Sequence, residues 1–388
     1  MRKIILLVLV VLFAALQFFR PSLDNPPVVA DVKGPPVLRR ACYNCHSNET
    51  RLPWFDRIVP AYWQVVSDVR RGRAALNFST WDPHRTDLLY ESLNQMTFGV
   101  MPLASYRFVH RGAAISDSDI AVFKAYLRSL PPVNTGDSSR LGALRRQALA
   151  WRWPSFTAVS PSLGGIPYPA GFDRWGIIST SDRRDNGTMR VIFGNDVAMR
   201  AARSGNTHPW PDGTVFAKVA WPEVLDSASG LIHSGIFRQV EIMVKDHKAY
   251  ASTEGWGFAR WLGLSLSPYK GPSSECASCH ATMKDRDFVF TVPVQSGVPS
   301  GWSLVGSFID TRAGTMSTLY GDSVAVDAAR RRPLLDDDTV WSYPKGSGLR
   351  LVTWSEREDP EWFGAFIPGE LKSAAAPKDF SLRASVIP

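Results

Sequence analysis

The sequence predicts a multidomain protein: a mainly α N-terminal domain, followed by a mainly β (α+β) domain with a degenerate second copy of its fold. Three observations predict this class. A helix with clear start and stop signals closes the segment that ends at Pro132, short apolar runs between turn residues fill most of the remainder, and part of that remainder repeats at a constant offset. The chain has 388 residues, 45% of them hydrophobic, which excludes disordered and collagen-like classes.

The net charge of +8, from 44 Lys and Arg against 36 Asp and Glu, is modest for this length. No block of Lys and Arg with interleaved aromatic residues occurs, so nucleic-acid binding has no support. The charge allows only a weak preference for acidic partner proteins or anionic membrane surfaces.

Residues 1–20 predict a membrane anchor or an export signal. Arg2 and Lys3 precede a run from Ile4 to Phe19 in which only Gln17 is polar. This run is longer than a usual signal core and slightly short for a spanning helix. A cleavage site at Val28-Val29-Ala30 would lie well beyond the run, past two prolines, so an uncleaved anchor at 4–19 is favoured over export with cleavage. A buried helix of a soluble protein is the remaining alternative.

The first domain is predicted to cover residues 21–132. Residues 21–40 are rich in proline and are expected to form an extended tether. Ser116 and Asp119 form an N-cap pair, and apolar residues then follow at helical spacing until Pro131-Pro132. Residues 133–165 are predicted to be a linker, with one helix around Arg140 to Trp151.

The second domain is predicted at residues 166–295. Apolar runs such as Val215–Trp221 and Val240–Val244 alternate there with turn clusters, which indicates strands. Trp175–Arg203 can be laid over Trp302–Arg330 with matched glycines and tryptophans, which predicts that residues 296–388 duplicate the fold. This copy contains neither Cys nor His, so it cannot hold a haem through Cys and His.

The four cysteines all lie in two C-x-x-C-H motifs. The first is Cys42, Cys45 and His46, and the second is Cys276, Cys279 and His280. In this motif both thiols bond to a haem and the histidine becomes the proximal iron ligand. A redox dithiol, a disulfide or half of a zinc site are the alternatives, but the βαβ context of a redox motif is missing at both places. A joint zinc site would have to bring together two motifs that lie far apart in the chain.

Two covalently attached c-type haems are therefore predicted. In bacteria such haems are attached outside the cytoplasmic membrane, which agrees with the export signal. The expected location is the periplasmic side of that membrane. For the first haem, the expected sixth ligand is Met101, which would give His/Met ligation with His46. Met101 lies well beyond His46 in the chain and before the helix that ends the first domain. Met96 and His110 compete for that role, and Met101 could instead be a core residue.

Two resemblances to known families follow from longer segments. CYNCHSNETRLPWFDRIVP (42–60), LNFSTW (76–81) and MPLASYRFVH (101–110) resemble the small monohaem haem-binding domain family of exported bacterial proteins over residues 20–132. ECASCHATMKDRDFVFT (275–291), PDGTVFAKVAW (211–221), VEIMVKDHKAY (240–250) and EGWGFARW (254–261) resemble the cytochrome P-460 family, which includes cytochrome c-prime-beta, over residues 166–293. The resemblances imply a cytochrome c-like domain and then an antiparallel β-fold with a five-coordinate c-type haem.

The second resemblance also implies two functional side chains. In the enzymes of the family a lysine is bonded to the porphyrin edge, and its match here is Lys218; the second copy has Leu351 in its place. The apolar neighbours of Lys218 predict a lowered pKa and a nucleophilic neutral amine, against the alternative of a lysine that reaches water. Glu241 matches an acidic residue that could take protons from hydroxylamine, against an exposed strand residue. His233 and His247 are expected at the surface.

The expected function is that of an exported, membrane-tethered dihaem cytochrome. Its P-460-like haem would oxidise or bind a small nitrogen compound such as hydroxylamine or nitric oxide. Electrons would leave through the His46/Met101 haem to a redox partner protein. The alternatives are a nitric-oxide-binding protein without turnover and a plain electron-transfer cytochrome. Residues 296–388 are expected to pack on residues 166–293 as an intrachain pseudo-dimer.

Overall fold

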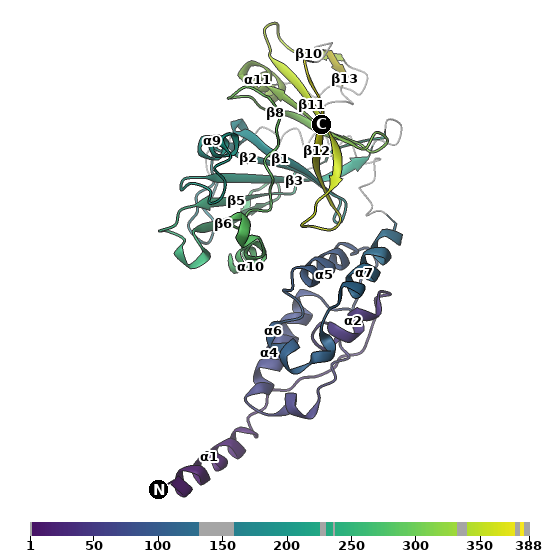
Figure 1. Ribbon diagram of the computed structural model, residues 1–388, viewed down its shortest axis with the longest axis vertical. Helices are drawn as coiled ribbons and strands as arrows, with labels where there is room; N and C mark the ends of the chain where they lie inside the picture. The colour runs from purple at the N-terminus through teal and green to yellow at the C-terminus, as the bar shows by residue number, and fades with distance from the viewer. Residues whose placement is uncertain are drawn as a thin grey trace. The chain divides into compact units, whose positions relative to one another are not determined.

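The computed structural model describes residues 2–131, 159–225, 230–235, 237–331, 340–376 and 381–383. It divides the chain into two compact units, Met1–Val133 and Asn134–Pro388 (Figure 1). The helix expected around Arg140 to Trp151, and most of the expected linker, lie outside the described residues.

The N-terminal unit is helical, as predicted. Its longest helices are α1 and α4, with 15 residues each, and the first C-x-x-C-H motif lies on the short helix α3 and at its start. The elements are α1 (Arg2–Leu16), α2 (Pro36–Ala41), α3 (Tyr43–His46), η1 (Trp54–Arg57), α4 (Ala61–Ala75), α5 (Asp87–Thr97), α6 (Ala104–Val109), η2 (Arg111–Ala113) and α7 (Asp117–Ser129).

Helix α7 begins and ends where the sequence predicts. The Ser116 hydroxyl accepts from the backbone N–H of Asp119, whose carboxylate accepts in turn from the backbone N–H of Ser116. The same carboxylate accepts a hydrogen bond of 2.6 Å from Arg40 on α2. The capping residue therefore also ties α7 to the helix that leads into the first motif.

The expectation of an extended tether at residues 21–40 is wrong. Residues 36–41 form α2, and the preceding chain is bonded to the N-terminal unit: Ala30 pairs with Thr80, and Arg73 donates to the carbonyl of Asp24. Val37 and Leu38 are buried. Buried apolar side chains at intervals among the prolines fix this segment, which composition alone does not reveal.

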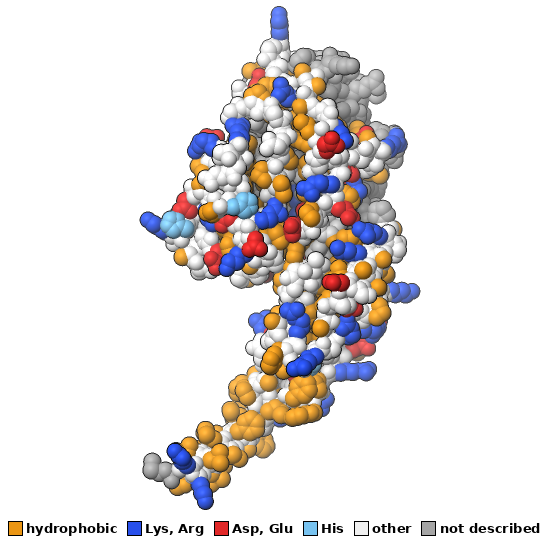
Figure 2. Space-filling model, viewed as in Figure 1, with side chains coloured by type: hydrophobic (Ala, Val, Ile, Leu, Met, Phe, Trp, Pro, Cys, Tyr) orange, Lys and Arg blue, Asp and Glu red, His pale blue; other side chains and the backbone are white. Residues whose placement is uncertain are grey.

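Gln17, directly after α1, is bonded to Val59: its side-chain amide N–H donates to the carbonyl of Val59 and its amide oxygen accepts from the Val59 N–H, both at 3.0 Å. Apolar side chains cover α1 along its length (Figure 2). From Ile4 to Phe13 they are 48% to 66% exposed. Among the described residues, no helix has the length and apolar character needed to cross a membrane.

The C-terminal unit is built on an antiparallel sheet of eleven strands within the described residues, in the order β2-β1-β12-β11-β9-β8-β4-β3-β5-β6-β7. Strand β2 pairs with β3 as well as with β1, so the part of the sheet that runs from β2 to β3 in this order forms a closed barrel. Strands β5, β6 and β7 continue the sheet beyond β3. The strands are β1 (Gly176–Arg183), β2 (Thr188–Gly194), β3 (Val215–Leu225), β4 (Leu231–Ser234), β5 (Gln239–Lys245), β6 (Trp256–Leu262), β7 (Ser267–Pro268), β8 (Ser303–Asp310), β9 (Thr315–Gly321), β11 (Leu349–Glu358) and β12 (Ala365–Ala375).

The helices of this unit are η4 (Phe172–Arg174), α9 (Asp196–Ser204), η5 (Ala251–Thr253), α10 (Ser274–His280), η6 (Ala281–Arg286) and α11 (Ser323–Arg331). Along the chain, η4 precedes β1 and the other helices of this unit connect successive strands. Strands β10 (Val340–Ser342) and β13 (Ser381–Arg383) form a separate pair. The repeat seen in the sequence also appears in the structure. Strands β1 and β2 and helix α9 begin and end at residues that match the bounds of β8, β9 and α11, at the same sequence offset that separates Trp175 from Trp302.

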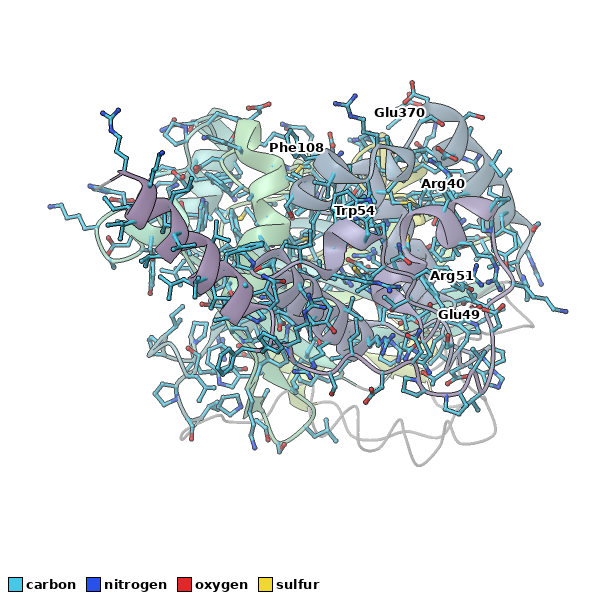
Figure 3. The ribbon with its side chains drawn as sticks, turned by 90° about the horizontal axis from the view of Figure 1, so that it is seen from below. Arg40, Glu49, Arg51, Trp54, Phe108 and Glu370 are labelled. Atoms are coloured by element: carbon cyan, nitrogen blue, oxygen red, sulfur yellow. The ribbon has the colours of Figure 1, made fainter. Side chains whose placement is uncertain are left out.

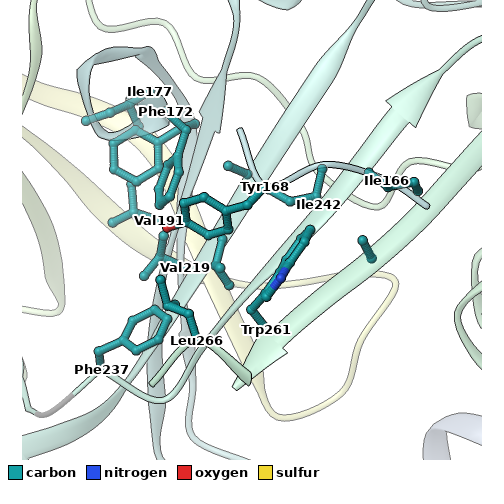
Figure 4. Packing of buried hydrophobic residues seen from close by; sticks show 14 of the residues in the cluster. Ile166, Tyr168, Phe172, Ile177, Val191, Val219, Phe237, Ile242, Trp261 and Leu266 are labelled. Carbon is teal, nitrogen blue, oxygen red and sulfur yellow. The ribbon is translucent and has the colours of Figure 1, made fainter. Parts of the chain in front are cut away.

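The two halves of the C-terminal unit share one sheet and one core. Strand β4 pairs with β8, and β1 pairs with β12, so strands after residue 296 complete the sheet begun before it. The largest apolar cluster, shown in part in Figure 4, joins Val191, Val219 and Trp261 to Tyr320 and Trp354. Hydrophobic burial therefore links the two halves directly.

His233 is buried, contrary to the expectation of a surface residue. It lies on β4, which is paired with β3 on one side and with β8 on the other, and it is 7% exposed. The covering strand β8 comes from the C-terminal half, where Phe308 lies opposite His233, so the local sequence could not show the burial. His247 is exposed and pairs with Asp212.

Candidate haem-binding sites

The first motif presents two thiols and a histidine on one short helix. Cys42 and Cys45 are free and half-buried. Burial raises the pKa of Cys42 to about 12 and that of Cys45 to about 11, so both are thiols at neutral pH. Protonated thiols with a histidine next to them are the set of groups that covalent haem attachment needs.

His46 is oriented by the backbone of the segment after α4. Its Nδ1 lies 3.1 Å from the carbonyl oxygen of Leu76. Because a carbonyl only accepts, Nδ1 carries the proton and the lone pair is on Nε2. Burial lowers the pKa of His46, which favours the neutral imidazole that binds a metal.

Gly72 on α4 allows this helix to lie against the motif. A Cβ at that position would lie 2.6 Å from the carbonyl oxygen of Cys45, which is too close for any other residue. The sequence offered only a weak signal, an isolated glycine within a helical pattern, and Gly72 was not among the predicted site residues.

The structure places the three candidate sixth ligands differently. Met96 is buried in the core on α5, and His110 Nε2 lies 2.8 Å from Asp56 Oδ2. The His110 ring also stacks on Tyr106 at 4.1 Å, and the Tyr106 hydroxyl accepts from Asn44, between the two cysteines. Met101 is half-buried in the loop between α5 and α6.

The aromatic residues Trp54 and Phe108, labelled in Figure 3, belong to this unit and lie on η1 and α6. They are 75% and 82% exposed.

The second motif lies on α10 against an apolar face of the sheet. Cys276 and Ala277 pack on a cluster that contains Phe216, Trp256 and Phe258. His280 Nδ1 lies 2.7 Å from the carbonyl oxygen of Phe288, so here too Nε2 carries the lone pair. Burial lowers the pKa of His280 to about 4, which keeps the imidazole neutral.

Lys218, Glu241 and Arg260 stand side by side on β3, β5 and β6, because the strand register pairs each with the next. Lys218 forms an ion pair with one oxygen of Glu241, and Arg260 approaches the other oxygen at 2.7 Å. Burial would raise the pKa of Glu241, but the charges of Lys218, Arg260 and Arg190 outweigh it and hold this pKa well below its usual range.

Burial lowers the pKa of Lys218, although Glu241 opposes the shift. The direction agrees with the expectation from the apolar neighbours in sequence, but the group that faces the amine is a carboxylate. About a third of the side chain is exposed. Lys218 is therefore neither a lysine in an apolar pocket nor one that reaches freely into water.

The charges of Lys218 and Glu241 both act on the pKa values of Cys276 and His280. The structure thus brings four predicted site residues of the second unit together. The predictions missed Arg190 and Arg260. Arg260 could have been found because it is the only charged residue of the apolar run Trp256–Leu262, as Lys218 is of the run Val215–Trp221.

The C-terminal half also contributes to the surroundings of the second motif. The ring of Trp362, in the turn between β11 and β12, lies 6.0 Å from the ring of Phe290, which itself contacts His280 at 5.2 Å. Trp362 Nε1 donates to Asp185 at 3.1 Å. Nothing in the sequence pattern indicated Trp362, because it lies outside the matched segments of the repeat.

Two alternatives for the cysteine motifs lose support. Cys42, Cys45 and Cys276 form no disulfide, and the two motifs lie in different units. Within the part of the chain that the structure describes, no three Cys, His, Asp or Glu side chains gather as metal ligands. Each motif therefore presents thiols and a histidine that could hold a haem within its own unit.

Comparison with protein families agrees with this interpretation. The model described as Haem-binding domain matches residues 11–129, which include the first motif. The model described as Cytochrome P460 matches residues 169–291, which include Lys218, Glu241 and the second motif. The comparison with curated proteins gave no match. The chain is therefore a haem protein in which a Haem-binding domain is fused to a Cytochrome P460 domain.

Proposed function

We propose that the protein is an exported dihaem c-type cytochrome that oxidises a small nitrogen compound such as hydroxylamine. The observation that carries the proposal is the Lys218–Glu241 pair beside the second motif, whose His280 keeps Nε2 for iron. A haem bound there supplies a redox-active iron that can take electrons from such a compound. A haem held by Cys42, Cys45 and His46 would supply an acceptor for these electrons, and a redox partner protein would take them up.

Covalent attachment of both haems is supported by the state of the motifs. Each presents two cysteines and a histidine whose Nδ1 is already bonded to a backbone carbonyl. That hydrogen bond fixes the ring and leaves Nε2 as the metal ligand. At the first haem, Met101 is the proposed sixth ligand because Met96 lies in the core and His110 is paired with Asp56.

Lys218 and Glu241 have linked roles in this proposal. While Lys218 is an ammonium, its charge keeps Glu241 ionised and a poor proton acceptor. The bond between Lys218 and the porphyrin edge, implied by the family resemblance, would remove that ammonium. The pKa of Glu241 would then rise, and its carboxylate would become a better base for protons released from the substrate.

The C-terminal half is proposed to be the haem-free copy of the fold. At the position that matches Lys218 it has Leu351, and the strand partner of Leu351 is Ala375, where Lys218 has Glu241. An apolar pair cannot exchange protons, so this half would serve packing within an intrachain pseudo-dimer.

We further propose that the segment before residue 30 is retained as a membrane anchor on the periplasmic side. The exposed apolar side chains of α1 support an apolar environment for this helix. Cleavage after Ala30 would remove Gln17 and Asn25, which are bonded to Val59 and to Arg73 within the N-terminal unit. Retention therefore preserves contacts that the unit uses.

Mass spectrometry and the absorption spectrum of the purified protein test these proposals together. Two covalent haems are expected, one of them lost in the double variant Cys276→Ala/Cys279→Ala. A red-shifted ferrous band together with hydroxylamine oxidation would support the enzyme. An ordinary high-spin c-type spectrum would instead indicate a nitric-oxide-binding protein without turnover, and two low-spin haems would leave only electron transfer.

A further inference from the structure

The turn that holds His280 has a strained backbone. After α10 and η6, Asp287 and Phe288 have φ angles of 49° and 65°, in the left-handed region that non-glycine residues rarely adopt. The carbonyl of Phe288 is the acceptor for His280 Nδ1–H at 2.7 Å. The position of this carbonyl therefore depends on contacts that keep two residues in an unfavourable conformation.

The backbone N–H groups of Asp287 and Phe288 donate to the carbonyls of Lys284 and Met283, and the side chain of Asp287 adds contacts to more distant segments. Its Oδ1 lies 2.7 Å from Lys245 Nζ, and its Oδ2 accepts a hydrogen bond of 2.9 Å from the backbone N–H of Trp210. The side chains of Lys245 and Asp287 are only 8% and 10% exposed. Lys245 Nζ also lies 4.9 Å from the centroid of the buried Trp256 ring.

Lys245 is itself fixed. It ends β5, its N–H donates to the carbonyl of Thr214, and its carbonyl accepts from Gly213. A cation anchored to the sheet thus holds a carboxylate on the turn. When one member of such a buried pair is removed, the other is left as an uncompensated buried charge. Loss of Lys245 would therefore favour a turn conformation in which the Asp287 carboxylate reaches water.

We propose that Lys245 and Asp287 are positioning residues that set the strength of His280 as an axial ligand through the carbonyl of Phe288. An acceptor at Nδ1–H raises the basicity of Nε2 and fixes the orientation of the ring. Without the ion pair, Asp287 and Phe288 relax toward right-handed backbone conformations, and the carbonyl moves away from the imidazole. The inference rests on the proposed haem at the second motif.

The test uses the purified full-length holoprotein with Asp287→Asn or Lys245→Met. Resonance Raman spectroscopy of the ferrous protein measures the iron–histidine stretching frequency, and spectroelectrochemical titration measures the potential of the second haem. Both variants are expected to lower the frequency. They should also raise the ferrous-to-ferric ratio at a given potential about tenfold, which corresponds to about 59 mV for one electron.

Matched variants separate positioning from simple stability. Asp212→Asn removes another acid–base pair, with His247 just after β5, but that pair is exposed and does not touch the turn, so both signals should stay unchanged. Lys245→Arg keeps the ion pair and should retain wild-type values. The double variant Lys245→Met/Asp287→Asn should shift both signals no further than either single variant, because the two residues act as a unit.

The proposal is overturned if Lys245→Met and Asp287→Asn lower thermal stability while frequency and potential remain those of the wild type. It is also overturned if Lys245→Arg shifts the frequency as far as Lys245→Met does. A wild-type protein with no haem at Cys276 and Cys279 would contradict the proposed function instead.

Discussion

Lys218 and Glu241 face each other in register across β3 and β5 and form an ion pair beside the second haem motif. Arg260 on β6 contacts the other oxygen of Glu241 at 2.7 Å. The protonation of Glu241 is therefore controlled by two cations on neighbouring strands, and any change to the amine of Lys218 changes the basicity of the carboxylate.

Lys218→Met is expected to abolish a red-shifted ferrous band and to lower hydroxylamine oxidation at least tenfold, because the amine is lost. Because the proposed bond to the porphyrin already removes the ammonium charge in the wild type, the remaining activity of the variant should keep the pH dependence of the wild type. Absorption spectra and a pH–rate profile measure both effects. Lys248→Met, on the exposed turn after β5, is the control. An unchanged ferrous band in Lys218→Met would contradict the link.

Gly72→Ala is expected to disturb only the first haem site. The added Cβ would lie 2.6 Å from the Cys45 carbonyl and force α4 away from the motif, at a cost of about 1–3 kcal/mol. Mass spectrometry should show reduced haem attachment at Cys42 and Cys45, with the second site fully loaded. Gly112→Ala, where a Cβ meets nothing within 4 Å, should behave as wild type. Equal loading in both variants would show that the contact can relax.

Met101→Ala is expected to convert the first haem from low-spin to high-spin while ligand binding at the second haem is unchanged. The physical reason is that loss of the thioether leaves the iron with His46 alone. Electron paramagnetic resonance at low temperature distinguishes the two spin states. If His110→Ala or Met96→Ala produces the conversion and Met101→Ala does not, the proposed ligand is wrong.

The stability of the C-terminal unit should fall as pH rises above about 4, because of Glu223 on β3. Burial and the neighbouring Asp182 raise the pKa of Glu223, and both side chains are almost completely buried. The folded state therefore holds a proton that the unfolded state, with a pKa of about 4.3, releases. Stability due to this group is present at low pH and decreases with rising pH, by at most about 1.4 kcal/mol per pH unit.

Glu223→Gln removes this titration while keeping a donor for Asp182. Chemical denaturation at pH 5 and pH 9 should show a smaller loss of stability at pH 9 in the variant than in the wild type. Arg184, which contacts Asp182 at 2.9 Å, and Asp185 stay unchanged in the comparison. The same pH dependence in both proteins would exclude Glu223 as its source.

Deletion of residues 296–388 should make the remaining P460-type domain insoluble or dimeric. The deletion removes the strand partners of β1 and β4 and takes Tyr320 and Trp354 out of the core. Exposed strand edges and apolar surface favour association. The full-length protein is expected to be a monomer, measured by light scattering after detergent extraction. A soluble, monomeric and fully active truncation would show that the C-terminal half has another role.

The residues that carry the haem chemistry could be predicted because their signals are local. The C-x-x-C-H spacing requires only neighbouring residues, and the capping box of α7 and the apolar runs of β3 and β5 are equally local signals. The constant offset between β1 and β8 was likewise visible, since matched glycines and tryptophans keep their spacing in sequence.

Tertiary structure alone decided which charges meet. Arg260 reaches Glu241 through strand register, and Lys245 reaches Asp287 on a turn far along the chain, and neither relation follows from local periodicity. The burial of His233 depends on β8, and the place of residues 21–40 depends on buried Val37 and Leu38. Hydrophobic burial and long-range strand pairing act between distant parts of the chain, so the sequence determined which groups can hold haem, and packing determined the charges that surround them.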